Sequence, residues 1–210
     1  MVHTVFNFIQ QGGIVMFPLL IGIFVALTMV VERIFSLRSY TKHIALIQPV
    51  ADAISRSDLN AARRKLDSFT GPIPTVLRTG ILNIDANQEL LDNALKVAFY
   101  EEVQHLQKFL PTIQILGAIM PMLGLLGSVM GMVHIFGGLG QVGLGDPTVM
   151  AKGISEALVA TETGLAGAIP VMFLHNYLVS MSDRIMMGLK RATVTVHHIA
   201  MVRKEGKSDV

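Results

Sequence analysis

Four polar side chains interrupt long apolar stretches of this sequence, and they are the residues best placed to do chemistry. Ser128 lies in PMLGLLGSVMGM, and Glu156, Thr161 and Glu162 lie in KGISEALVATETGLAGAIPVMFLHNY. If these stretches cross a membrane, an ionised Glu162 would cost on the order of 3 kcal/mol and should face protein or water rather than lipid. Hydroxyl and carboxyl groups at such depth mark a path for protons or small cations.

Structural explanations for the same side chains stay open at this point. Lys152 lies four residues before Glu156, so the two could pair along one face of a helix. The Ser128 hydroxyl could bond to the carbonyl group one helical turn before it. Thr161 and Glu162 point about 100° apart on an ideal helix, so they cannot both face straight into one narrow pore.

Two other kinds of chemistry have little support. A hydrolase within the membrane would use Ser128 as nucleophile and a membrane histidine as base, but no G-x-S-x-G or H-E-x-x-H motif occurs. His197 and His198 are adjacent, so on a helix they diverge and make a poor metal-binding pair. Because the chain has no cysteine, we expect no disulfide, and we expect no metal and no cofactor apart from a coupling ion.

Composition and apolar runs place the chain in a membrane. Hydrophobic residues make up 51% of the 210 residues and charged ones 15%, which is too apolar for an ordinary soluble domain. Residues 14–31, 109–136 and 153–179 are each long enough to cross a bilayer core of roughly 30 Å. Pro111 and Pro121 are tolerable in the second run because neighbouring helices can satisfy the freed backbone groups. The basic residues form no aromatic-interleaved cluster, so no nucleic-acid partner is expected.

Lysine and arginine predict how the chain crosses the membrane, because short basic segments stay in the cytoplasm. Ten of the 17 fall between the first two spans and six follow the third, while only Lys152 lies between the second and third. No basic region precedes the first span, so it should stay attached rather than be cleaved as a signal peptide. We expect a periplasmic N-terminus (1–12), transmembrane helices (13–35, 109–136 and 148–180), a cytoplasmic helical segment (36–108), a periplasmic loop (137–147) and a cytoplasmic C-terminal helix and tail (181–210).

The segments outside the membrane have helical patterns, so the expected fold is all-α. Ser57-Asp58 is a helix start signal, and Gly71-Pro72 begins a break. From about Asn87 an apolar stripe runs directly into the second span, which predicts one long helix there. A second stripe follows the third span, for which Asp146-Pro147 is the expected cap. The stripes consist of Leu91, Leu95, Ala98 and Val103, and of Ile185, Leu189, Ala192, Val196 and Ala200.

Small residues recur at helical spacing within the second and third spans. Such spacing lets helix backbones approach closely, which is how spanning helices pack when the surrounding lipid is as apolar as they are. We expect these positions to pack helices, with or without a role in ion movement. They are Gly124, Gly127 and Gly131 in the second span and Ala160, Gly164 and Ala168 in the third.

Three stretches of the chain carry a resemblance to a known family. Residues 12–38 have a GG-x-x-M-x-P-L start and leave the membrane at Glu32-Arg33. Residues 123–136, LGLLGSVMGMVHIF, are similar to G-L-L-G-T-V-x-G-M-x-x-x-F. Residues 153–177 are similar to I-x-E-A-L-x-x-T-x-x-G-L-x-x-A-I-P-x-x-x-x-x-N. In this order and with these gaps, the chain resembles the MotA/TolQ/ExbB proton-channel family, in its three-span TolQ/ExbB branch.

The resemblance implies the ring subunit of a proton-driven motor in a bacterial inner membrane. A homopentamer would surround the helices of about two copies of a single-span TolR/ExbD-like partner. In the family an aspartate of that partner carries the proton; here Ser128 and Thr161 would supply the hydroxyls that face it, with Glu156 in the outer part of the path. Proton movement would drive TonB-type uptake or Tol-type envelope work through a TonB- or TolA-like protein. Sodium stays open as the coupling ion, and a passive membrane scaffold is the alternative function.

Two positions depart from the family pattern. Ser128 stands where the family usually has threonine, which keeps the hydroxyl but drops a methyl group. Glu162 stands where a small or apolar residue is expected. We hypothesise that Glu162 is protonated, because removal from water favours a neutral carboxyl group, and that it forms a hydrogen bond between subunits. An additional proton site is the other explanation.

Overall fold

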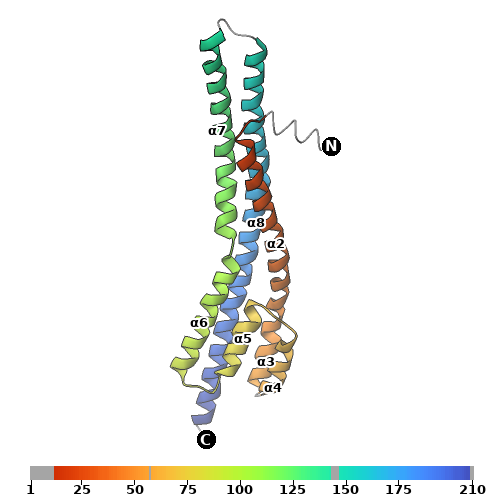
Figure 1. Ribbon diagram of the computed structural model, residues 1–210. Coiled ribbons are helices and arrows are strands. Elements are labelled where there is room, and N and C mark those ends of the chain that lie inside the picture. Colours follow the sequence, from red (N-terminus) through yellow and green to blue (C-terminus); the bar gives the residue numbers. More distant parts are fainter. Residues whose placement is uncertain (1–11, 57, 143–146, 209–210) are drawn as a thin grey trace. The chain divides into compact units, whose positions relative to one another are not determined.

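The computed structural model describes residues 12–56, 58–142 and 147–208, and within these ranges every regular element is a helix. This confirms the all-α fold expected from the sequence. The elements, coloured along the chain in Figure 1, are α2 (Met16–Thr41), the 3-10 helix η1 (Lys42–Leu46), α3 (Ile47–Ser55), α4 (Leu59–Asp67), α5 (Pro72–Leu82), α6 (Gln88–Gln107), α7 (Leu110–Val142) and α8 (Pro147–Ser208).

Three stretches of helix are long and apolar enough to cross a membrane, as the sequence predicted. They are Met16–Ser55, Gln88–Gly137 and Met150–Lys204, and their most apolar windows have mean hydropathies of 2.0, 1.9 and 1.6. α8 begins at Pro147, and the expected cap Asp146 lies outside the described residues. Helix bounds do not mark where lipid begins, so the span boundaries and the orientation stay predictions.

The chain folds into two compact units. The first, which we call the membrane unit, comprises Met1–Glu32 and Phe109–Tyr177. The second unit comprises Arg33–Lys108 and Leu178–Val210. Helices α2 and α8 each contribute residues to both units, whereas α7 belongs to the membrane unit and α3 to α6 belong to the second unit.

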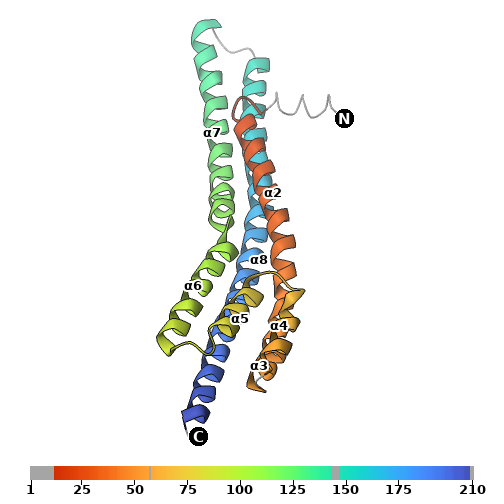
Figure 2. The same cartoon turned by 60° about the horizontal axis from the view of Figure 1, so that its bottom comes forward.

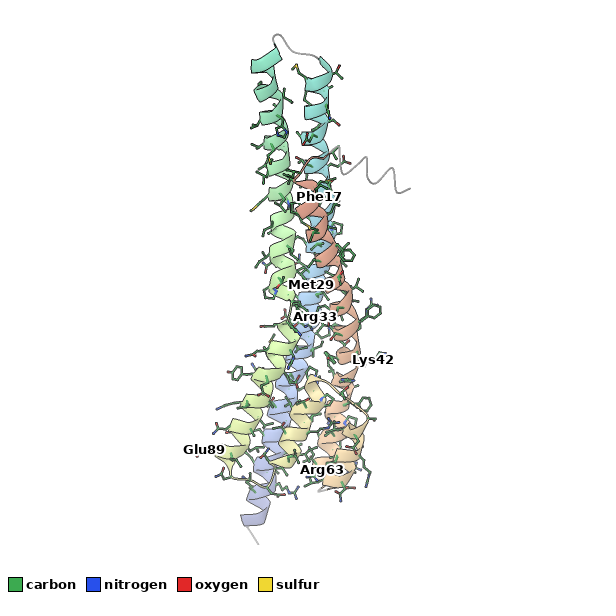
Figure 3. The ribbon with its side chains drawn as sticks, viewed as in Figure 1. Phe17, Met29, Arg33, Lys42, Arg63 and Glu89 are labelled. Carbon is green, nitrogen blue, oxygen red and sulfur yellow. The ribbon has the colours of Figure 1, made fainter. Side chains whose placement is uncertain are left out.

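The membrane unit is a bundle of three helices, made by the first part of α2, by α7 and by the first part of α8. Figures 1 and 2 both show α7 beside α8, and Figure 3 labels Phe17 and Met29 on the α2 part. Large side chains such as Phe24 and Phe173 point outward, at 73% and 76% exposure, which suits contact with lipid or with other chains. The buried faces consist of Leu19, Ala26 and Val30 in α2, Ile113, Met120 and Ile135 in α7, and Ala157, Ala160 and Val171 in α8.

The second unit has its own apolar core, in which α3, α4, α5 and α6 gather around the last part of α8 (Figure 2). Both apolar stripes predicted from the sequence are buried there, because each forms one face of a helix. Val103 is partly buried against the same core. The buried stripe residues are Leu91, Leu95 and Ala98 in α6 and Ile185, Leu189, Ala192, Val196 and Ala200 in α8.

Local sequence signals set the ends of the shorter helices. The Asp58 side chain accepts a 2.8 Å hydrogen bond from the backbone N–H of Ala61 and so caps α4, as predicted, while Ser57 lies outside the described residues. Gly71 precedes α5 with a φ of 136°, and Pro72 is the first helical residue. An L side chain would be strained at this φ, so the turn requires glycine.

The prediction of one long helix from Asn87 into the second span is wrong. α6 ends at Gln107 and α7 begins at Leu110, with Phe109 between them in a left-handed conformation at a φ of 66°. Pro111 explains the break, because in a continuous helix its ring would clash with the carbonyl group of Gln107, four residues earlier. As the second residue of α7, Pro111 needs no hydrogen bond.

One buried histidine of the second unit lies in an aromatic cluster. His43 is 8% exposed, its ring meets that of Phe69 edge-on with centroids 5.5 Å apart, and the Tyr40 ring lies 6.2 Å away. Its Nδ1 atom has no hydrogen-bond partner among the described residues. Burial removes the ring from water and lowers the pKa of His43 below its usual 6.5.

We predict that His43 makes the second unit less stable in acid. Because its pKa is lower in the folded state, the unfolded chain binds more protons as the pH falls below 6.5, and stability falls with it. The melting temperature of detergent-purified protein should drop between about pH 7 and about pH 5, and less so in His43→Phe. His198→Gln, at an exposed position, is the control and should keep the wild-type slope. Equal slopes for wild type and His43→Phe would contradict the prediction.

Candidate functional site

The helices α7 and α8 meet with their backbones in contact. A Cβ atom added at Gly164 would lie 2.7 Å from the carbonyl oxygen of Met120 and 3.1 Å from the Cα atom of Gly124. A Cβ atom added at Gly124 would lie 3.0 Å from the carbonyl oxygen of Ala160. These neighbours are backbone atoms that cannot rotate away, so glycine at both positions is what allows the helices to approach.

The same contact continues along α7. A Cβ atom at Gly131 would lie 2.9 Å from the carbonyl oxygen of Gly153, and one at Gly127 would collide with the methyl group of Ala160. Ala168 is 4% exposed. The five positions expected to pack helices are therefore all buried within the membrane unit, namely Gly124, Gly127, Gly131, Gly164 and Ala168.

The two hydroxyls expected to line an ion path belong to this helix pair, and each donates its hydrogen to backbone. Thr161 Oγ1 lies 3.1 Å from the carbonyl oxygen of Ala157 on its own helix and 3.2 Å from that of Gly124 on α7. Ser128 Oγ lies 2.7 Å from the carbonyl oxygen of Leu125, three residues earlier. A hydroxyl oxygen has one hydrogen and two lone pairs, so each of these oxygens keeps the capacity to accept a hydrogen bond.

Ser128 and Thr161 lie on adjacent turns of the facing helices. The Cα atom of Thr161 would lie 3.1 Å from a Cβ atom at Gly124, and Ser128 follows Gly124 by one helical turn, about 5 to 6 Å along the axis. Both side chains are half-buried. The structure therefore brings the two hydroxyls to the same part of the membrane unit.

Glu156 lies with its carboxyl group against Gly13, at the turn that leads into α2. A Cβ atom at Gly13 would collide with the Oε1 atom of Glu156 and lie 2.8 Å from its Cδ atom. Gly13 has a φ of 71°, which glycine adopts without strain, so both conformation and space favour glycine here. The pairing of Glu156 with Lys152 considered from the sequence is not formed among the described residues.

Glu162 is not part of this group. It is exposed, whereas the neighbouring positions Ala160 and Gly164 are buried on the face of α8 that meets α7. Two residues along a helix correspond to a turn of about 200°, so Glu162 points away from that face. The structure thus separates Glu162 from the side of α8 that contacts its own chain.

The expected exit pair lies where α2 passes from the membrane unit into the second unit. Arg33 is 4% exposed, and its Nη1 atom donates a 3.3 Å hydrogen bond to the carbonyl oxygen of His105 within the second unit. Glu32 is exposed and is the last α2 residue of the membrane unit. No sequence pattern signals the contact with His105, because only its backbone carbonyl group takes part.

The two adjacent histidines point to different neighbours. The Nε2 atom of His197 lies 2.9 Å from the Asp92 carboxylate, while His198 lines a hollow with Ile54 and Arg203. No group of three or more potential metal ligands occurs within the ranges that the structure describes. His175, in the third span, is 6% exposed.

The fold and this site define a multi-pass helical membrane protein with hydroxyl groups in closely packed spans. The sequence matches the MotA/TolQ/ExbB proton channel family over residues 68–191, more than half of the 210 residues, and the chain belongs to that family. This confirms the resemblance expected from the sequence. The matched region includes Ser128, Glu156, Thr161 and Glu162. The chain is therefore a membrane protein of the proton-channel type that serves energy transduction.

A named relative agrees with this family. The chain is 28% identical over 183 residues to a protein of Methanothermobacter thermautotrophicus that carries the provisional name biopolymer transport protein ExbB homolog. The match covers 86% of this chain and 64% of the relative, so the chain spans somewhat less than two thirds of the relative's length.

We predict that widening the contact between α7 and α8 destabilises the membrane unit. Gly164→Val should force the backbones apart and lower stability by about 1–3 kcal/mol, the usual cost of overpacking. Gly22→Val is the matched control, because a Cβ atom at Gly22 on α2 meets nothing within 4 Å. Melting temperatures of the two detergent-purified variants test this directly, and equal values would show that the glycine contact is not limiting.

Proposed function

We propose that this chain is the ring subunit of a proton-driven motor in a bacterial inner membrane, with its N-terminus in the periplasm and its C-terminus in the cytoplasm. A homopentamer surrounds about two copies of a single-span TolR/ExbD-like helix. The motor passes proton-motive force to the periplasm or outer membrane, for TonB-type uptake or Tol-type envelope work through a TonB- or TolA-like protein. Family membership and the three membrane-length helices support the general part of this proposal.

The observation that carries the proposal is the orientation of two hydroxyl groups. Ser128 and Thr161 direct their hydrogens at backbone carbonyl groups, so their oxygens can accept a hydrogen bond from a protonated acid or a hydronium ion. An acceptor that is already oriented needs no reorganisation when the proton arrives. This supports a proton path over a passive scaffold, for which buried hydroxyl groups serve no purpose.

The acid that carries the proton is expected on another chain. No aspartate occurs in the three predicted spans. Glu156 precedes Thr161 by five residues, about 7.5 Å along the helix, and its carboxyl group lies against Gly13. We therefore assign Glu156 to the outer part of the path and the proton carrier to the partner helix. The same oxygens also suit sodium, so the coupling ion is part of the test.

We predict that native mass spectrometry of the detergent-purified protein shows a homopentamer. Coexpression with the small single-span protein encoded beside it should add about two copies of an acid-bearing partner. Such a complex would make flux measurements on the variants below meaningful. A monomer or dimer that binds no partner would overturn the ring and favour the scaffold function.

We predict that Thr161→Ala lowers proton flux through the complex in liposomes by about tenfold or more, because a hydrogen bond to a charged group is lost. Thr163→Ala is the matched control, since Thr163 also donates to the carbonyl oxygen four residues earlier, with Oγ1 2.8 Å from that of Val159. Repeating the assay without sodium identifies the coupling ion. Unchanged flux in Thr161→Ala would remove the hydroxyl path.

Ser128→Thr separates the motor from the hydrolase considered from the sequence. A proton path needs only the hydroxyl and should tolerate the added methyl group, whereas a nucleophile would be crippled by it. In the structure the Ser128 hydroxyl donates to Leu125 rather than to a histidine. Loss of flux in Ser128→Thr, with assembly intact, would count against the proposed path.

A further inference from the structure

Glu162 is a carboxyl group on the outward face of α8 that lacks a partner in its own chain. It is exposed and forms no hydrogen bond or ion pair among the described residues. It points about 160 to 200° away from the buried positions Ala160 and Gly164. Its neighbours on this outward face are large and apolar, at 65, 47, 67 and 76% exposure, namely Leu158, Leu165, Ile169 and Phe173.

A partner for Glu162 must come from another chain. In lipid an ionised carboxylate is costly, and even a neutral carboxyl group costs free energy unless it forms a hydrogen bond. Lys152, the nearest basic residue along α8, precedes Glu162 by ten residues, about 15 Å along the helix. No basic side chain of the same helix therefore neutralises Glu162.

A second copy of this chain offers a suitable partner, and depth in the membrane identifies it. In a ring whose axis is normal to the membrane, every copy lies at the same depth, so Glu162 meets only groups at its own level. The contacts of Gly124 with Thr161 and of Gly127 with Ala160 give the correspondence between α7 and α8. By this correspondence Ser128 is level with residue 159, about 4.5 Å from Glu162 along the axis.

The remaining separation is within reach of a glutamate side chain. Side chains on a helix lean toward its N-terminus, which for Glu162 is the direction of the Ser128 level. Other exposed polar groups lie farther off: His134 on α7 is level with residue 153, about 13 Å away along the axis, and Thr28 on α2 is level with residue 172, about 15 Å away. Ser128 is thus the exposed polar group of α7 closest in depth.

Ser128 also borders a surface into which a helix can fit. It lines an apolar hollow of about 470 Å³ on the outer side of α7 with Val129, Met132, Val133 and Phe136. Because the Ser128 hydroxyl donates to the Leu125 carbonyl group, its oxygen is an acceptor facing outward. A protonated carboxyl group surrounded by apolar side chains is the complement of this surface.

We infer that Glu162, in its neutral form, donates a hydrogen bond to the Ser128 hydroxyl of the adjacent copy, so that α8 of one copy lies in the α7 hollow of the next. The inference rests on the proposed ring and adds the contact that holds neighbouring copies in register. It also places one pathway hydroxyl of each copy under the control of its neighbour.

Disulfide cross-linking tests the contact, because the chain has no cysteine of its own. The double variant Ser128→Cys with Glu162→Cys, oxidised in membranes together with the coexpressed partner, should give a ladder of covalent oligomers on a denaturing gel. The pair cannot close within one chain, since Glu162 faces away from α7 and a disulfide requires Cα atoms within about 7 Å.

The matched control is Ser128→Cys with Phe173→Cys, which uses the same outward face of α8 but a level about 16 Å from Glu162 along the axis. It should give no ladder. A pentamer by native mass spectrometry without cross-linking above this control would overturn the contact and leave the ring standing. A cross-link from Glu162→Cys to the partner chain would place Glu162 in the pore and overturn the contact as well. Absence of any oligomer would overturn both the contact and the ring.

Two substitutions at Glu162 give a second measurement. Glu162→Leu removes the donor and should weaken association by about three- to tenfold per interface, seen as dissociation of the ring on dilution in detergent. Glu162→Gln keeps a donor of similar shape and should keep both the ring and proton flux. Loss of flux in Glu162→Gln with the ring intact would show that the carboxyl group carries protons itself and would refute the structural role.

Discussion

Backbone contact between α7 and α8 at Gly124 and Gly164 is the constraint on which the rest of the membrane unit depends. Lipid provides no hydrophobic force that drives helices together, so the bundle relies on close van der Waals contact. The same approach brings the Thr161 hydroxyl to the Gly124 carbonyl group and fixes the level of Ser128 against α8. It also leaves the large side chains no place except the outer faces, where Glu162 stands among them.

Features that repeat along a helix could be predicted from the sequence. The stripe that contains Leu189 and Val196 was visible because its spacing follows the helical period, and those residues are buried. The length of the apolar runs likewise indicated three membrane-length helices. The cap at Asp58 was predictable because its signal and its effect lie within four residues of each other.

Features that depend on one residue or on distant partners were not predictable. Pro111 could either kink a continuous helix or begin a new one, and only the fold shows that it begins α7. The contact of Glu156 with Gly13 joins residues far apart in the sequence, and neither follows a periodic pattern. The roles of Ser128 and Thr161 depend on chains outside this one, so their geometry is known while their function remains a proposal.

The break at Phe109 gives the three covalent links between the two units different mechanical properties. α2 and α8 pass from one unit to the other as uninterrupted helices, while the third link contains a residue at a φ of 66°. A tilt of the spanning helices changes the path length along each link, and an intact helix resists stretching because its hydrogen bonds would have to open. The third link is a joint, where the same change is absorbed by rotation about a few backbone bonds.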